Sequence, residues 1–129
     1  MATTSNLFSL LLLLLLLCII HRVNAGLGAA CSASDITIRQ RKTGAVVEGK
    51  PEYEVSVSNG CRCVQSQVVL RCYGLSSVEA VDRRAIRPVD DERCVVAEGR
   101  PLSRRTPVKF KYAWMTPQDF PVISSQITC

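Results

Sequence analysis

Two stretches of the chain alternate strictly between apolar and polar side chains, the pattern of a strand with one buried and one wet face. They are EYEVSVS at residues 52–58 and VKFKYAW at residues 108–114. The side chains predicted to face the core are Tyr53, Val55, Val57, Val108, Phe110, Tyr112 and Trp114. Both stretches are therefore predicted to be half-buried β-strands.

The residues after the first of these strands predict a tight turn and a returning strand. Asn59-Gly60 accepts the positive φ values that a short hairpin requires. The β-rich residues 64–72 are then expected to pair back against residues 52–58. Because three cysteines lie on this returning limb, the hairpin is predicted to be a hub from which disulfides reach both ends of the chain.

The rest of the chain consists of shorter β-patterned runs separated by turn residues. Further strands are expected at residues 36–40, 94–97 and 122–129. Residues 41–50 are predicted to be a loop. Residues 73–93 have no clear period, and helical spacing over residues 77–84 competes there with a short strand at residues 78–81. Short, evenly spaced strands favour an all-β fold, a small antiparallel β-sandwich.

The N-terminus has the layout of a cleaved signal peptide. Eight consecutive leucines, residues 10–17, form the centre of an apolar run that is shorter than the roughly 20 residues needed to span a bilayer. The sequence VNA before Gly26 matches a signal-peptidase site. We therefore expect a signal peptide at residues 1–25 and one secreted domain at residues 26–129, with no membrane span after cleavage.

The cysteine content indicates a disulfide-bridged domain. The chain has seven cysteines, and removing Cys18 with the signal peptide leaves an even set, as expected for a small secreted protein. Cys61 and Cys63 are too close along a strand to bridge each other, so each is expected to have a distant partner. The other pairings stay open. The cysteines predicted to form disulfides are Cys31, Cys61, Cys63, Cys72, Cys94 and Cys129.

The chain lacks most of the groups that catalysis uses. Its single histidine, His21, would be lost with the signal peptide, which excludes Ser-His and Cys-His pairs and imidazole metal ligands. No glycine-rich phosphate loop is present. A two-carboxylate hydrolase would draw on Asp90, Asp91 and Glu92, but these acids are expected to form a solvated turn. We therefore predict a protein that is not an enzyme and binds neither metal nor cofactor.

The chain has a net charge of +5 at pH 7, and its basic residues gather in several places. One group lies at residues 39–42. The arginines that we select as candidate partner contacts are Arg83, Arg84, Arg87, Arg104 and Arg105. Such patches suit an acidic protein surface or pectin-like polyanions, while the simpler interpretation is a solvated surface. A nucleic-acid partner is not expected.

Tyr112 and Trp114 share one face of a predicted strand. Core packing is the favoured role for both rings. The alternative is a platform on which sugar rings stack, as in the carboxy-terminal domain of expansins. This alternative would make the chain an extracellular carbohydrate-binding module of the cell wall.

Taken in order, five segments of the chain resemble the plant TAPETUM DETERMINANT family, and in particular its grass-type homologues. The segments are CSASDI (31–36), GKPEYEVSVSNGC (49–61), VVLRCYGLSSVEAVD (68–82), RCVVAEGRPL (93–102) and, within residues 108–129, VKFKYAW and FPVISSQITC. The similarity runs through almost all of the expected secreted domain. The C-x-C at residues 61–63 departs from the wider cysteine spacing of better-known members.

The resemblance implies a small protein ligand that is secreted into the apoplast. Members of this family engage leucine-rich-repeat receptor kinases of the EXCESS MICROSPOROCYTES type, together with a co-receptor kinase. They specify tapetal cells and limit sporocyte number during anther and ovule development. A compact, bridged, basic domain without catalytic groups agrees with this role, because a preorganised ligand loses less entropy on binding.

Overall fold

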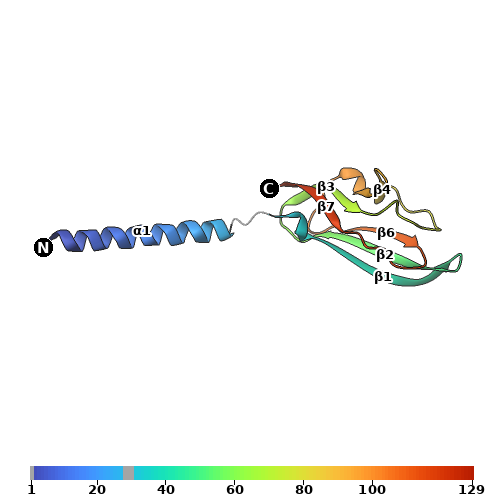
Figure 1. The fold of residues 1–129 in the computed structure, drawn as a ribbon, viewed down its shortest axis with the longest axis horizontal. Coiled ribbons are helices and arrows are strands. Elements are labelled where there is room, and N and C mark those ends of the chain that lie inside the picture. The colour runs from blue at the N-terminus through green and yellow to red at the C-terminus, as the bar shows by residue number, and fades with distance from the viewer. Residues whose placement is uncertain (1, 28–30) are drawn as a thin grey trace. The chain divides into compact units, whose positions relative to one another are not determined.

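The computed structural model describes residues 2–27 and 31–129, which divide into an N-terminal helical unit and a β domain, Cys31–Cys129 (Figure 1). In the helical unit, α1 (Ala2–Leu27) carries the leucine run, whose side chains are exposed. Within the described residues, no helical stretch has the length and hydropathy needed to cross a membrane. The side chains of the expected cleavage site, residues 23–25, fall outside the described residues, so the signal peptide stays a prediction.

The β domain consists of two antiparallel sheets. The strands are β1 (Ile36–Val47), β2 (Lys50–Asn59), β3 (Val64–Arg71), β4 (Ile86–Pro88), β5 (Arg93–Val96), β6 (Val108–Ala113) and β7 (Val122–Thr128), with 3-10 turns η1 (Ala33–Asp35) and η2 (Ala97–Gly99). The sheet orders are β1-β2-β6 and β4-β5-β3-β7. Figure 1 shows them as two layers, and buried side chains from both form one core. The expected disulfide-bridged antiparallel β-sandwich is confirmed.

β2 is the central strand of the first sheet, and its side chains alternate as predicted. Tyr53, Val55 and Val57 are buried, while the intervening polar residues are half-exposed. β6 pairs antiparallel with β2 and places Tyr112 opposite Tyr53. The two rings stack with centroids 5.3 Å apart. The alternation therefore identified the buried faces of both strands.

The expected hairpin between residues 52–58 and 64–72 is wrong. β2 pairs with β1 and β6, whereas β3 pairs with β5 and β7 in the other sheet. Asn59 and Gly60 do not have positive φ values. Asn59 is instead buried, and its amide group donates hydrogen bonds to the carbonyls of Cys63 and Leu102, each at 2.9 Å. These bonds hold a crossing from one sheet to the other where a tight turn was expected.

The hairpin of the first sheet lies between β1 and β2, so the expected loop at residues 41–50 is also wrong. Glu48 and Gly49 have φ values of 47° and 75°, the left-handed geometry of a two-residue hairpin turn. β1 continues to Val47 across an irregularity between Lys42 and Val46. This part of the strand is not recognisable in the sequence, because β1 is an edge strand. Residues 44–46 are exposed, so they need no alternation of apolar and polar side chains.

The connection after β3 is neither the helix nor the strand that competed for residues 77–84. It runs as turns and bends until β4. Val78 N–H donates to the Ala113 carbonyl at 2.9 Å, and the Ser77 hydroxyl oxygen accepts from Ala113 N–H at 3.0 Å. These bonds fasten the connection to the end of β6.

Three disulfides link Cys31 to Cys61, Cys63 to Cys129 and Cys72 to Cys94. Cys61 and Cys63 thus tie the crossing between the sheets to the beginning and the end of the β domain. Cys18 in α1 is an exposed free thiol.

Candidate interaction surface

The first group of candidate arginines lies where the connection after β3 enters β4. Arg83 and Arg84 are exposed, and Arg87 is half-buried within β4. Arg84 Nε lies 3.7 Å from Asp82 Oδ1, a loose ion pair with both side chains largely in solvent. Arg83 and Arg84 line different hollows, so two neighbours in sequence present their charges to different parts of the surface.

Arg104 and Arg105 form the second group, in the turn that precedes β6. Both are exposed. The hollows lined by the first group include neither of them. The candidate arginines are therefore accessible, fully or in part, but they belong to separate surface elements.

The outer face of the β1-β2-β6 sheet gathers charges that are far apart in the sequence. The cross-strand register places Arg41, Glu54 and Lys111 in one row. The neighbouring row consists of Arg39, Ser56 and Lys109. Arg41 Nη2 lies 3.1 Å from Glu54 Oε1 in an exposed ion pair. This face is a mixed-charge surface rather than a purely basic one.

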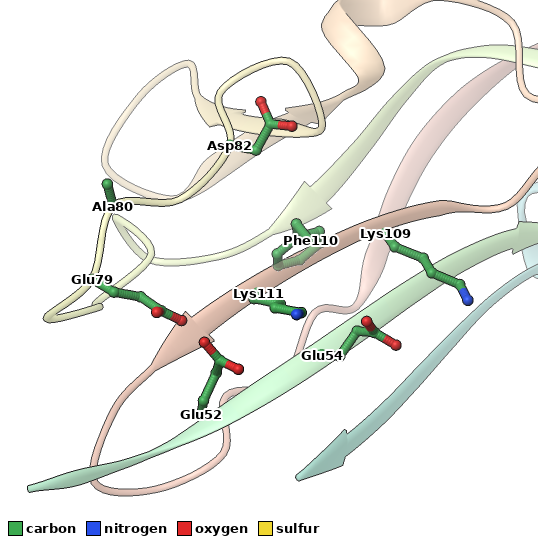
Figure 2. Close-up of a pocket in the computed structure, with 8 residues that line it drawn as sticks. All are labelled: Glu52, Glu54, Glu79, Ala80, Asp82, Lys109, Phe110 and Lys111. Carbon is green, nitrogen blue, oxygen red and sulfur yellow. The ribbon is translucent and has the colours of Figure 1, made fainter. Parts of the chain in front are cut away.

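A hollow of about 340 Å³ lies on this face, and Figure 2 shows the residues that line it, where the connection after β3 approaches β2 and β6. Its lining residues are Glu52, Glu54, Glu79, Ala80, Asp82, Lys109, Phe110 and Lys111. Two lysines thus lie among four carboxyl groups in an open hollow.

Glu52 and Glu79 point toward each other in this hollow (Figure 2). A hydrogen bond from the Thr43 hydroxyl, 2.7 Å from Glu52 Oε1, lowers the pKa of Glu52, and the hydrogen bond with Glu79 lowers it further. Burial raises the pKa of Glu79, and the bond to Glu52 and the negative charge there raise it further. The pKa values of the two carboxyl groups are therefore shifted in opposite directions, so that Glu79 takes up a proton more readily than Glu52.

The acids that the sequence offered for a hydrolase lie elsewhere, in the exposed turn between β4 and β5. Asp90 Oδ2 lies 2.6 Å from Arg93 Nη2. The Arg93 side chain and two backbone N–H groups of the turn lower the pKa of Asp90 to about 2. Such a carboxylate closes a turn and does not donate protons near neutrality.

Tyr112 is fully buried, so its alternative role as a sugar platform is wrong. Its ring packs between Tyr53 and Phe120, at centroid distances of 5.3 Å and 5.7 Å. Its hydroxyl donates to Gln40 Oε1 and accepts from Gln118 N–H at 2.8 Å. Trp114 packs only partly against the core and lines a surface hollow together with Tyr73.

Glu79 and Tyr73 are the surface residues that sequence reasoning missed. Both lie in the connection after β3, where the sequence has no clear period. The one local signal is Gly74, which marks a turn beside Tyr73. Their spatial neighbours come from β2, β6 and the β6–β7 connection, so only the tertiary fold brings these groups together.

A family model described as "Tapetum determinant 1, C-terminal" matches residues 32–129. "TPD1 protein homolog 1" of Arabidopsis thaliana is 30% identical over 105 residues, which cover 80% of this chain and 58% of the relative. "TPD1 protein homolog 1A" of Oryza sativa subsp. japonica is 33% identical over 117 residues, covering 84% of this chain and 50% of the relative.

The matched region thus spans little more than half the length of these curated relatives. No solved structure matches the chain significantly.

Proposed function

The chain belongs to the tapetum determinant 1 family, and from this membership we propose that it is a secreted protein ligand acting in reproductive development. Its partner in this proposal is the ectodomain of a leucine-rich-repeat receptor kinase, joined by a co-receptor kinase. The ligand would act in the apoplast of anther or ovule after removal of residues 1–25. The observation that carries the proposal is the family match over residues 32–129, which include every strand of the β domain.

The architecture of the β domain supports a binding role. Three disulfides brace the two sheets, and the sheet faces and loops carry exposed charges of both signs. A rigid fold loses little conformational entropy on association, so more of the contact energy remains for affinity. Exposed complementary charges raise the association rate.

We assign no catalytic role to the carboxyl groups of Figure 2. Glu52 and Glu79 line an open hollow, and the positive charge of Lys111 beside them lowers the pKa of both. Their position between β2 and the connection after β3 suits a contact that holds this connection to the sheet. The proposed ligand therefore works by binding alone.

The proposal is tested by binding of the protein, secreted from cells that express the full chain, to a panel of receptor-kinase ectodomains. Wall polysaccharides form a parallel arm. Saturable binding to one ectodomain is expected, and mass spectrometry of the same protein is expected to show an N-terminus at Gly26. A protein that binds polysaccharide and no ectodomain would contradict the proposal.

The candidate arginines enter the proposal as receptor contacts. Reversal of Arg83, Arg84 and Arg87 to Glu is expected to weaken binding roughly tenfold or more. The reason is that contacts between opposite charges of ligand and receptor at the interface rim would become contacts between like charges. The matched control reverses Arg39 and Lys109 on the outer face of the first sheet. Equal thermal unfolding of both variants would show that they are folded, and an unchanged affinity in the first would remove the arginines from the interface.

A further inference from the structure

Tyr73 is an exposed aromatic residue held in an unfavourable backbone conformation. Its side chain is 65% exposed. Tyr73, Gly74 and Leu75 all have positive φ values, 44°, 82° and 53°. Two of these three are not glycine, so the turn stores strain, and such strain is concentrated at functional sites. Neither the core nor the disulfides require an aromatic side chain at this exposed position.

Beside this turn lies a hollow of about 500 Å³, a size typical of ligand pockets. Tyr73 and Trp114 supply its aromatic surfaces, and Arg71 and Asp119 its charges. Met115, which follows Trp114 in the chain, is 67% exposed. We call this feature the Tyr73–Trp114 groove.

Hydrogen bonds fix the groove in advance of binding. Gln118 Nε2 donates to the Ser76 carbonyl at 2.6 Å, and Ser76 N–H donates to Gln118 Oε1 at 3.3 Å. This pair of bonds joins the connection after β3 to the β6–β7 connection. Gln118 N–H also donates to the buried Tyr112 hydroxyl. The Tyr73 side of the groove is held by its N–H, which donates to the Glu92 carbonyl at 3.1 Å, and by the disulfide of Cys72.

The side chains of the groove favour a protein as its occupant. Tyr, Trp and Arg, which all line the groove, are residue types enriched at protein–protein interfaces and their hot spots. Arg71 and Asp119 carry opposite charges, and neither takes part in an ion pair within the described part of the chain. A polypeptide offers opposite charges to both groups at once, whereas a neutral sugar offers only hydroxyl groups and a polyuronate would be repelled by Asp119.

We propose that the Tyr73–Trp114 groove is the anchor site for a protein partner. An apolar side chain of the partner enters between Tyr73 and Trp114, and flanking acidic and basic groups of the partner contact Arg71 and Asp119. The inference rests on the proposed function in taking the partner to be a receptor ectodomain. In this inference the centre of the interface is the preformed aromatic groove, and not the separate arginine groups.

The test compares ectodomain affinities of variants that remove exposed side chains, one lining the groove and one beside it, without disturbing the core. Tyr73→Gly suits this purpose because glycine adopts a φ of 44° readily, so the variant is expected to be at least as stable as the natural protein. Met115→Ser removes the neighbouring exposed thioether. The matched control is Val46→Ser, an equally exposed apolar residue at 68%, near the β1–β2 hairpin. Tyr73→Gly and Met115→Ser are each expected to lower affinity roughly tenfold or more, and Val46→Ser less than about twofold.

A second readout follows the groove directly. The chain has one Trp, so ¹⁵N-labelled protein gives a single indole N–H signal even when the partner is unlabelled. Binding of the ectodomain is expected to shift this signal, and binding of a peptide selected from a random display library is expected to shift it too.

The outcomes separate the two proposals. If an ectodomain binds and both groove variants retain full affinity, the groove inference is overturned and the ligand function stands. If no ectodomain binds, the ligand function fails, and the peptide arm decides on the groove. Selected peptides that shift the Trp114 signal then support a different protein partner. If wall polysaccharide alone shifts the indole N–H signal of Trp114, the inference is overturned.

Discussion

Asn59 is 2% exposed, and every hydrogen-bonding atom of its side chain has a partner. Its amide nitrogen donates to two carbonyls, and Oδ1 accepts from Cys61 N–H at 3.0 Å and from Gln65 Nε2 at 3.3 Å. Gln65 is also buried, and its side chain reaches the Ser32 carbonyl and the Ser125 hydroxyl. This network fixes the crossing between the sheets, because a buried polar group without partners would be costly.

Asn59→Asp is expected to destabilise the fold by about 2–4 kcal/mol, although the side chain keeps its size. The carboxylate would face two carbonyl oxygens that now accept hydrogen bonds from the amide. Urea unfolding at neutral pH measures the loss. Ser58→Ala on the outward face is the control, with an expected change within about 0.5 kcal/mol. Equal midpoints for Asn59→Asp and the natural protein would show that the network adds nothing to stability.

The carboxyl pair of Glu52 and Glu79 makes stability depend on pH. The pKa of Glu79 is raised above its ordinary value of 4.5, first by burial and then by Glu52. The contribution of Glu79 is therefore fully present below pH 4.5 and is lost as the pH rises through the raised pKa. The lowered pKa of Glu52 acts in the opposite direction, so its contribution is present above pH 4.5 and is lost as the pH falls.

Glu79→Gln keeps a neutral hydrogen-bond donor toward Glu52 at every pH. This variant is expected to lose less stability than the natural protein as the pH rises from 4.5 through the raised pKa of Glu79 toward neutrality. The measurement is thermal unfolding across that range, with Glu54→Gln as a control carboxylate outside the pair. A Glu79→Gln profile parallel to that of the natural protein would contradict the raised pKa of Glu79.

At the scale of elements, alternation predicted which faces of β2 and β6 are buried, because each strand has one side in the sandwich core. It did not predict their partners. A period of two reports the buried face of a strand but not the neighbour with which it forms hydrogen bonds. Asn59-Gly60 therefore suggested a hairpin, while the turn at Glu48-Gly49 has no such marker at its first position.

The β1–β2 turn allows a direct test of how much stability its first residue, Glu48, costs in place of a residue that favours such a turn. Glu48 has a φ of 47°, a conformation that Asn adopts more readily than Glu. Glu48→Asn is expected to stabilise the domain by roughly 0.5–1 kcal/mol. The readout is the midpoint of urea unfolding. The variant for comparison is Glu98→Asn, because Glu98 is a second non-glycine residue with a positive φ, 57°. Destabilisation by Glu48→Asn would mean that the turn relaxes to another geometry in solution.

At the scale of the whole molecule, the sequence predicted the sandwich and the residue set of the disulfides but left their pairing open. Pairing follows from the sheet crossing, which brings Cys61 to Cys31 and Cys63 to Cys129 across 30 and 66 positions of the chain. The candidate arginines were chosen because they are charged, and a charged side chain is expected to be accessible to solvent. The Tyr73–Trp114 groove was not predictable, since Tyr73 lies in a connection without a pattern and tertiary hydrogen bonds between Ser76 and Gln118 join the parts of the chain that line the groove.

The disulfide-braced β domain is proposed to be a protein ligand. The most direct measurement is calorimetric titration of the oxidised, secreted protein into the receptor-kinase ectodomain that captures it in the panel, repeated after reduction of the disulfides. Saturable binding at a defined stoichiometry is expected, and it is expected to be lost on reduction, because the disulfides maintain the preformed surface. If the oxidised protein binds to none of the ectodomains, the β domain is not a ligand of these receptors.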